Sequence, residues 1–205
     1  MKEILVSLPY FGPINQFQQI VKHQKVWIEN EDNFQKQTYR NRMYIYGANG
    51  KLSLNIPIKH LPKAEEKVHQ KYYDVKIDNE DRWQSIHWKS LKTAYQTSPF
   101  FEFYEDDLAP LFTAKFTYLY EFNYQCFLKV LECLQLEVDF SKTSEYEKDP
   151  KNKLDLRYLS NAKTKIQIPE YIQVFQEKYG FISNLSILDL LFNEGPNSAE
   201  YLRNM

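Results

Sequence analysis

The opening of the chain constrains its fold more than any other segment. Residues 4–8 form a nearly continuous apolar run that ends at Pro9, which is typical of a strand buried on both faces. Residues 14–23 carry apolar side chains on one helical face, and residues 26–28 predict a second strand. A strand, a helix and a strand so close together predict a compact βαβ unit with a parallel pair of strands.

The segments that follow predict further strands. Residues 43–46 and 52–58 have strand character, and residues 48–50 between them predict a hairpin turn because Asn-Gly accepts positive φ. A charged loop is expected over residues 63–71, and residues 75–77 predict a fifth strand. We therefore expect an α/β fold with a mixed, mostly N-terminal sheet of about five strands that opens with a βαβ unit.

The second half of the chain predicts helices that cover this sheet. Apolar periodicity favours helices over residues 82–96, 108–120, 123–136, 172–179 and 186–193. The polar stretch 139–162 has few periodic signals and predicts a long ordered loop or a mobile flap. We expect a single domain over residues 1–205, with a sheet-forming part at about 1–78 and a helical part at about 79–205.

Composition limits the partners that the chain can have. A formal net charge of −1 gives no field that favours long phosphate backbones, so we expect no nucleic acid, although a small anionic or nucleotide-activated ligand fits. Cys126 and Cys133 lie on one predicted helix, roughly 10 Å apart at 1.5 Å per residue, which is too far for a disulfide. No Cys/His spacing predicts a metal site. Without a membrane span or a signal peptide, the expected location is the cytoplasm.

Several phrases of the sequence, taken together, carry a family resemblance. They are Tyr10-Phe11-Gly12-Pro13, the Lys-Gln-Thr-Tyr-Arg-Asn-Arg run at 36–42, the Trp83 to Trp88 run with Tyr95 and 98–101 behind it, Asp155-Leu156-Arg157, and 185–195. In this order and spacing the chain resembles the WbqC-like family from Leu8 to Gly195. That family is linked to gene clusters for surface polysaccharide. The resemblance implies a transferase that acts on an activated sugar or another small activated substrate, and it identifies no cofactor.

Arg40, Asn41 and Arg42 are the first candidate ligand-binding residues. Two guanidiniums around an amide can bind phosphate or carboxylate, since arginine offers a planar fork of donors. In an extended segment Arg40 and Arg42 point the same way, so the two like charges need an anion or a nearby acid. The alternative is a surface pair, or a structural salt bridge to Asp32 or Glu29.

His87 is the candidate catalytic residue. It follows Trp83 by one helical turn on the inward face, and its ordinary pKa near 6.5 suits a general base or acid, although an inward histidine can also be a hydrogen-bonded core residue. Trp83 would give an apolar wall or a stacking plate, and Tyr95 would shape the same pocket. Tyr10 follows the first strand, where ligands bind in open α/β sheets, or it simply packs.

Asp155 and Arg157 lie in the polar stretch and could close over a ligand or pair with Arg40 or Arg42, and a solvated loop is the alternative. Asp189 follows Ser186 at the spacing of a helix-capping pair, so we expect it to cap a helix, and a functional role for Asp189 and Asn193 is the alternative.

Two functions stay open at this point. One is a transferase, and the other is a non-catalytic binding or assembly protein that uses the same pocket or an aromatic surface. No nucleophile elbow, phosphate-binding loop or dinucleotide fingerprint is present to choose another class of enzyme. The observation that discriminates is whether His87 and Arg42 converge on one concave site.

Overall fold

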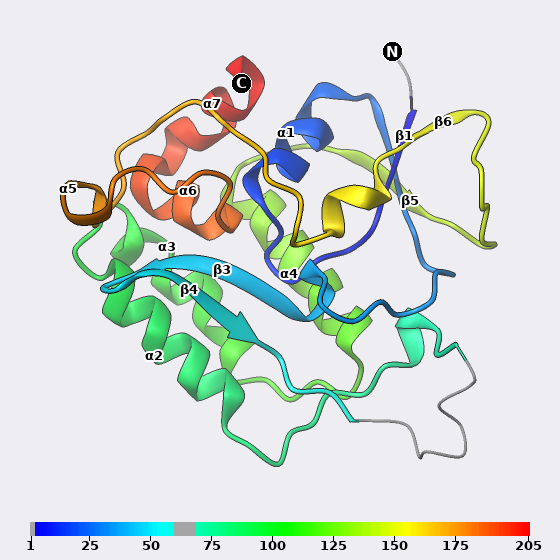
Figure 1. The fold of residues 1–205 in the computed structure, drawn as a ribbon, viewed down its shortest axis with the longest axis horizontal. Helices are drawn as coiled ribbons and strands as arrows, with labels where there is room; N and C mark the ends of the chain where they lie inside the picture. The colour runs from blue at the N-terminus through cyan, green and yellow to red at the C-terminus, as the bar shows by residue number, and fades with distance from the viewer. Residues whose placement is uncertain (1–2, 60–68) are drawn as a thin grey trace.

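The computed structural model describes residues 3–59 and 69–205 and contains a four-stranded parallel sheet, which lies toward one side of the molecule (Figure 1). Its spatial order is β5-β2-β1-β6. The strands are β1 (Glu3–Val6), β2 (Lys25–Ile28), β5 (Asp139–Lys142) and β6 (Lys153–Asp155). Helix α1 (Ile14–Lys22) joins β1 to β2, and Ile4 lies opposite Val26 in a parallel register. The predicted βαβ opening is therefore confirmed.

An antiparallel hairpin forms a separate two-stranded sheet. It consists of β3 (Arg42–Gly47) and β4 (Gly50–Asn55), with Arg42 opposite Asn55 at the open end. The turn lies where Asn49-Gly50 predicted it, and the positive φ of 93° is carried by Gly50. Beyond β4 the chain continues in extended form, and Ile58 makes a single bridge to Ile77.

Helices pack around both sheets. They are α2 (Trp83–Tyr95), α3 (Phe101–Leu108), α4 (Leu119–Cys133), α5 (Gln176–Tyr179), α6 (Ile187–Glu194) and α7 (Ser198–Asn204). Short 3-10 helices are η1 (Tyr39–Asn41), η2 (Tyr72–Asp74), η3 (Ala109–Phe112), η4 (Arg157–Ser160) and η5 (Gly195–Asn197). Figure 1 shows the hairpin between α2 and α6, and both helices contact β3. None of the described helices has the length and apolar character needed to span a bilayer.

The expectation of a loop or flap over residues 139–162 is wrong in its main part. This stretch supplies β5, β6 and η4, so two strands of the parallel sheet come from the half of the chain expected to be helical. Both are edge strands, and they pair through their backbones while many of their side chains stay exposed to solvent. The apolar runs that mark buried strands are therefore missing from their sequences.

Three further element predictions are corrected. Residues 75–77 join neither sheet. Ile77 bridges to Ile58 and Lys76 bridges to Tyr118, so this segment pairs with two different neighbours at single positions and forms no continuous ladder with either. The helix expected over 108–120 is instead the end of α3 followed by η3, with the next helix starting at Leu119. Only the last turn of the segment 172–179 is helical. The charged loop expected over 63–71 lies largely outside the described residues.

Candidate functional site

Two adjoining hollows lie along the chain where β4 ends. The first, here called the Arg42 hollow, has a volume of about 480 Å³, and its polar lining residues are Lys36, Gln37, Asn41, Arg42 and Asp78. The second, here called the His87 hollow, has a volume of about 530 Å³, and its lining includes Ser53, Asn55, Asp81, Arg82, Trp83, Ile86 and His87. Pro57 lines both hollows, so the two adjoin at this residue, but Arg42 and His87 line different hollows and do not converge on one concave site.

The Arg42 hollow is cationic. Arg42 begins β3 and is half-buried, and its Nε is enclosed without a hydrogen-bond partner among the described residues. Within residues 3–59 and 69–205, no carboxylate oxygen lies within 4 Å of Arg42 or Lys36. The adjacent Asn41 donates from Nδ2 to the carbonyl of Ile56 at 3.1 Å, and its Oδ1 is buried without a partner there. This hollow therefore offers the cationic side chains of Lys36 and Arg42 and the carboxylate of Asp78 to a ligand.

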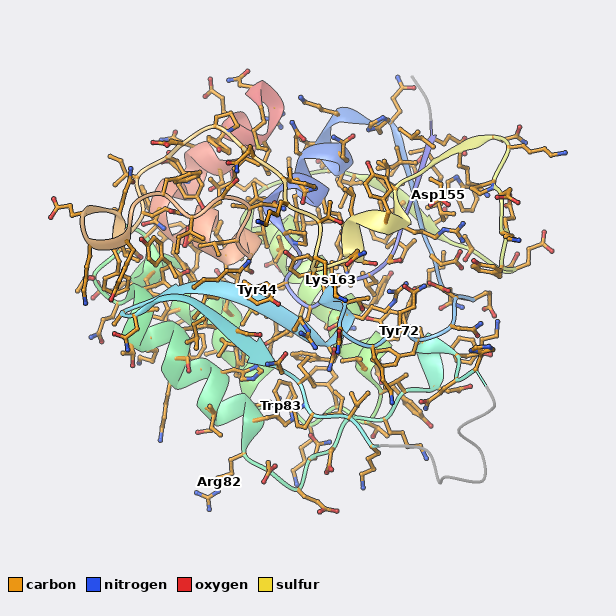
Figure 2. The ribbon with its side chains drawn as sticks, viewed as in Figure 1. Tyr44, Tyr72, Arg82, Trp83, Asp155 and Lys163 are labelled. Atoms are coloured by element: carbon orange, nitrogen blue, oxygen red, sulfur yellow. The ribbon has the colours of Figure 1, made fainter. Side chains whose placement is uncertain are left out.

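His87 lies against the second hollow as a neutral imidazole. Its side chain comes from the inward face of α2, is 3% exposed, and is within 2.9 Å of the Tyr10 hydroxyl through Nδ1. Burial lowers the pKa of His87 to about 4, and an interaction with the backbone of Asn55 opposes that effect. The ring of Trp83 meets the imidazole edge-on with centroids 5.2 Å apart. Figure 2 shows Trp83 beside Arg82 at the start of α2.

Arg40 lies in the interior and lines neither hollow. Its side chain is 1% exposed and its Nη2 pairs with Asp32 Oδ2 at 2.5 Å, which is the structural salt bridge weighed as the alternative. Nη2 also donates to Ser7 Oγ at 3.0 Å, and Nη1 donates to Ser160 Oγ at 3.3 Å. The expectation that Arg40 and Arg42 point the same way is wrong, because residues 39–41 form the 3-10 helix η1 instead of an extended segment.

Asp155 and Arg157 lie at the carboxyl end of β6 and pair with each other at 2.6 Å. Arg157 also pairs with the buried Glu29 at 3.0 Å. Burial alone would raise the pKa of Asp155, but hydrogen bonds from Arg157 hold that pKa below its ordinary value. Figure 2 shows Asp155 far from Trp83, and neither member of the pair lines the two hollows.

Tyr95 belongs to a different buried cluster. Its hydroxyl donates to Asp189 Oδ2 at 2.8 Å and accepts from the backbone N–H of Tyr46 at 2.9 Å. Asp189 is fully buried and also accepts from Tyr171 at 2.6 Å and from Gln173 at 3.1 Å. Burial raises the pKa of Asp189 to about 6, and these hydrogen bonds limit the rise.

The capping prediction for Asp189 is wrong. Ser186 caps α6 by accepting from the N–H of Leu188, while the carboxylate of Asp189 points into the tyrosine cluster.

Sequence reasoning missed part of the hollows. Lys36 lines the Arg42 hollow but was not chosen as a candidate, although it lies in the 36–42 run that carried the family resemblance. The positive charge of that run was the only feature of the sequence that pointed to Lys36. Asn55 and Asp78 reach the hollows through hairpin pairing and a chain crossing, which no local pattern in the sequence encodes. Among residues 3–59 and 69–205, no group of three His, Cys, Asp or Glu side chains is placed to hold a metal ion.

Comparison with known proteins gives a family and one distant relative. The WbqC-like protein family matches residues 8–173 and 151–201. Uncharacterized protein Rv1507c of Mycobacterium tuberculosis (strain ATCC 25618 / H37Rv) is 24% identical over 234 residues, which cover 99% of this chain and 98% of the relative. No solved structure matches the chain.

Proposed function

Because the chain belongs to the WbqC-like protein family, we propose that it is a transferase in bacterial surface glycan or envelope biosynthesis. In this proposal the protein acts in the cytoplasm, and its substrate is an activated sugar or another small activated molecule. The observation that carries the proposal is the pair of adjoining hollows, one lined by Lys36 and Arg42 and the other by His87.

The Arg42 hollow would hold the anionic group of the activated substrate. A guanidinium binds phosphate or carboxylate through a planar fork, and the ammonium of Lys36 adds a point charge. Because Arg42 is half-buried, its attraction for an anion is screened less than that of a fully exposed side chain. The carboxylate of Asp78 offers an acceptor to hydroxyl groups, which favours a hydroxyl-bearing anion such as an activated sugar.

The reacting centre would lie near Pro57, where the two hollows meet. His87 is the catalytic residue of the proposal, because it is the titratable ring on that side and is neutral at pH 7. Trp83 gives the apolar wall beside it, and Tyr10 lies behind the imidazole. Holding the anionic group and the reacting group in adjoining hollows would make the reaction effectively unimolecular.

A second candidate is a non-catalytic binding protein that uses the same groove. The 3% exposure of the His87 side chain favours it, because a general base must reach the proton that it removes. The two candidates make the same prediction for ligand binding at Arg42, and they differ in turnover alone.

A thermal-shift screen tests the proposal. The panel holds nucleotides, nucleotide sugars, coenzyme A thioesters and aminoacyl donors, with wild type, Arg42→Ala and Arg203→Ala measured side by side. Arg203 is an exposed residue of α7 far along the chain from both hollows, so its substitution controls for the loss of one positive charge. A ligand at a hundredfold excess over Kd stabilises the folded state by about 2.7 kcal/mol, which raises Tm by several degrees in a chain of this size.

We expect one ligand class to raise Tm in wild type and in Arg203→Ala but not in Arg42→Ala. The stabilising ligand is then incubated with the protein and candidate acceptors, and product formation separates the transferase from the binding protein. No shift with any ligand class, or an equal shift in Arg42→Ala, would overturn the assignment of the Arg42 hollow.

A further inference from the structure

The contact between Tyr10 and His87 is buried on both sides. The Tyr10 side chain is 0% exposed, and its hydroxyl oxygen lies 2.9 Å from Nδ1 of His87. The two rings are stacked at 28° with centroids 5.7 Å apart, while Trp83 and Phe122 complete the apolar surroundings. Such an enclosed pair has no access to bulk water that could satisfy a missing hydrogen bond.

A proton count decides which partner donates. The tyrosine hydroxyl has one hydrogen, and among the described residues the only hydrogen-bond partner of this hydroxyl is Nδ1 of His87. If Nδ1 carried the proton, the hydrogen of Tyr10 would be left buried without an acceptor. Burial also raises the pKa of Tyr10 well above its ordinary value, so the phenol keeps its hydrogen. Tyr10 is therefore the donor and Nδ1 the acceptor.

The second ring nitrogen interacts with the backbone of Asn55, a residue that lines the His87 hollow. Since Nδ1 is taken by Tyr10, the interaction of the ring with the backbone of Asn55 belongs to Nε2. Asn55 lines the His87 hollow together with the charged residues Asp81 and Arg82. In a neutral imidazole one nitrogen accepts and the other carries the hydrogen, so Nε2 is the N–H donor and the Asn55 carbonyl is its acceptor in the absence of a ligand.

We propose that Tyr10 is a positioning residue that fixes His87 as a neutral imidazole with its hydrogen on Nε2, so that the His87 hollow takes a substrate group whose acceptor oxygen replaces the Asn55 carbonyl on this hydrogen. That group is a carbonyl or phosphoryl oxygen, which the N–H polarises by hydrogen bonding while no proton leaves the ring. This inference rests on the proposed function and narrows the role of His87 from proton transfer to hydrogen-bond donation. A neutral histidine is an established chemical means of polarising an oxygen that gains negative charge.

The tautomer can be measured on the full chain without any ligand. The sequence has four histidines, so the ring signals in a long-range proton–nitrogen correlation spectrum are few, and His87→Gln assigns the one that disappears. At pH 7 we expect His87 to show a hydrogen on Nε2 and a bare, hydrogen-bonded Nδ1. A hydrogen on Nδ1, or a doubly protonated ring, would overturn the proposal.

Tyr10→Phe tests the positioning role, because it removes the hydroxyl and leaves the ring. We expect the Nδ1 signal of His87 to move away from its hydrogen-bonded position and the two tautomers to mix. Tyr39→Phe is the matched control, since Tyr39 is also buried and its hydroxyl does not contact His87. An unchanged tautomer in folded Tyr10→Phe would refute the role of Tyr10. If that variant does not fold, the wild-type spectrum alone still decides the tautomer.

These outcomes are separate from those of the ligand screen. A hydrogen on Nδ1 defeats the present inference while ligand binding at Arg42 stands. An empty screen defeats the proposed function while the Nε2 tautomer stands as a property of the fold.

Discussion

His87 and Asp189 are buried titratable residues whose effects on stability oppose each other as the pH changes. Burial lowers the pKa of His87 from 6.5 to about 4, and burial raises the pKa of Asp189 from 3.8 to about 6. Below pH 6.5 the unfolded chain binds a proton at His87 that the folded chain refuses, so acid weakens the fold. Below pH 6 the folded chain binds a proton at Asp189 that the unfolded chain does not yet bind, so acid strengthens it.

The two effects are close in size. A pKa difference of one corresponds to about 1.36 kcal/mol, so the full effect is about 3 kcal/mol for His87 between pH 6.5 and 4 and about 3 kcal/mol for Asp189 between pH 6 and 3.8. Their sum should therefore change by less than about 1 kcal/mol over most of this range. Removing one group exposes the effect of the other.

Urea unfolding at several pH values between 4 and 7.5 measures this directly, with the free energy of unfolding taken from the midpoint and slope. Relative to wild type, His87→Gln should gain about 3 kcal/mol on acidification from pH 6.5 to 4. Asp189→Asn should lose about 3 kcal/mol over the same range. Differences from wild type cancel the contribution of groups such as Asp155 that all three proteins share. Parallel curves for all three proteins would refute the reasoning, since neither buried group would then titrate between its folded and unfolded pKa values.

Two further predictions concern the interior. Arg40→Ala should cost about 3 to 5 kcal/mol of unfolding free energy, because it leaves the Asp32 carboxylate buried without its partner, and Arg40→Ala with Asp32→Asn should cost less than the sum of the single variants in a double-mutant cycle. Gly195→Ala should lower stability by at least about 1 to 2 kcal/mol in thermal or urea unfolding, because Gly195 has a φ of 53° and a Cβ there would lie 2.5 Å from the ring of Phe100. Equal stability of Gly195→Ala and wild type would contradict that geometry.

Local patterns in the sequence predicted the elements that are buried or strongly periodic. The opening βαβ unit, the 48–50 turn, α2 and α6 lie where apolar periodicity and turn chemistry predicted them. Strands β5 and β6 were missed because an edge strand is held by backbone pairing with its neighbour, and its side chains carry little of the apolar signal. Apolar character alone does not bury a residue, since Ile86 of α2 is 57% exposed and lines the His87 hollow.

The candidate site was predictable in part. His87, Trp83 and Arg42 were chosen from the sequence, and they line adjoining hollows that share Pro57. Tyr95 was also chosen, but its partner Asp189 lies far along the chain, and no spacing rule connects the two. Apolar periodicity describes one helix or strand at a time. It therefore cannot predict which residues of different elements are brought into contact by long-range packing.

The direction of Arg40 explains why the hollows lie beside the hairpin and not at the crevice of the parallel sheet. In open parallel sheets, ligands bind beyond the carboxyl ends of the strands where the strand order reverses, which in the order β5-β2-β1-β6 is between β1 and β6. Arg40 donates to Ser7, just past β1, and to Ser160, at the end of the η4 turn that follows β6, so the guanidinium bridges the segments that leave these two strands. Asp32 neutralises it there. Two residues later the same segment presents Arg42 to the Arg42 hollow, where no carboxylate oxygen among the described residues lies within 4 Å of it. An anionic ligand is therefore expected at Arg42. The burial of Arg40 fixes the position of this segment and so the place of Arg42.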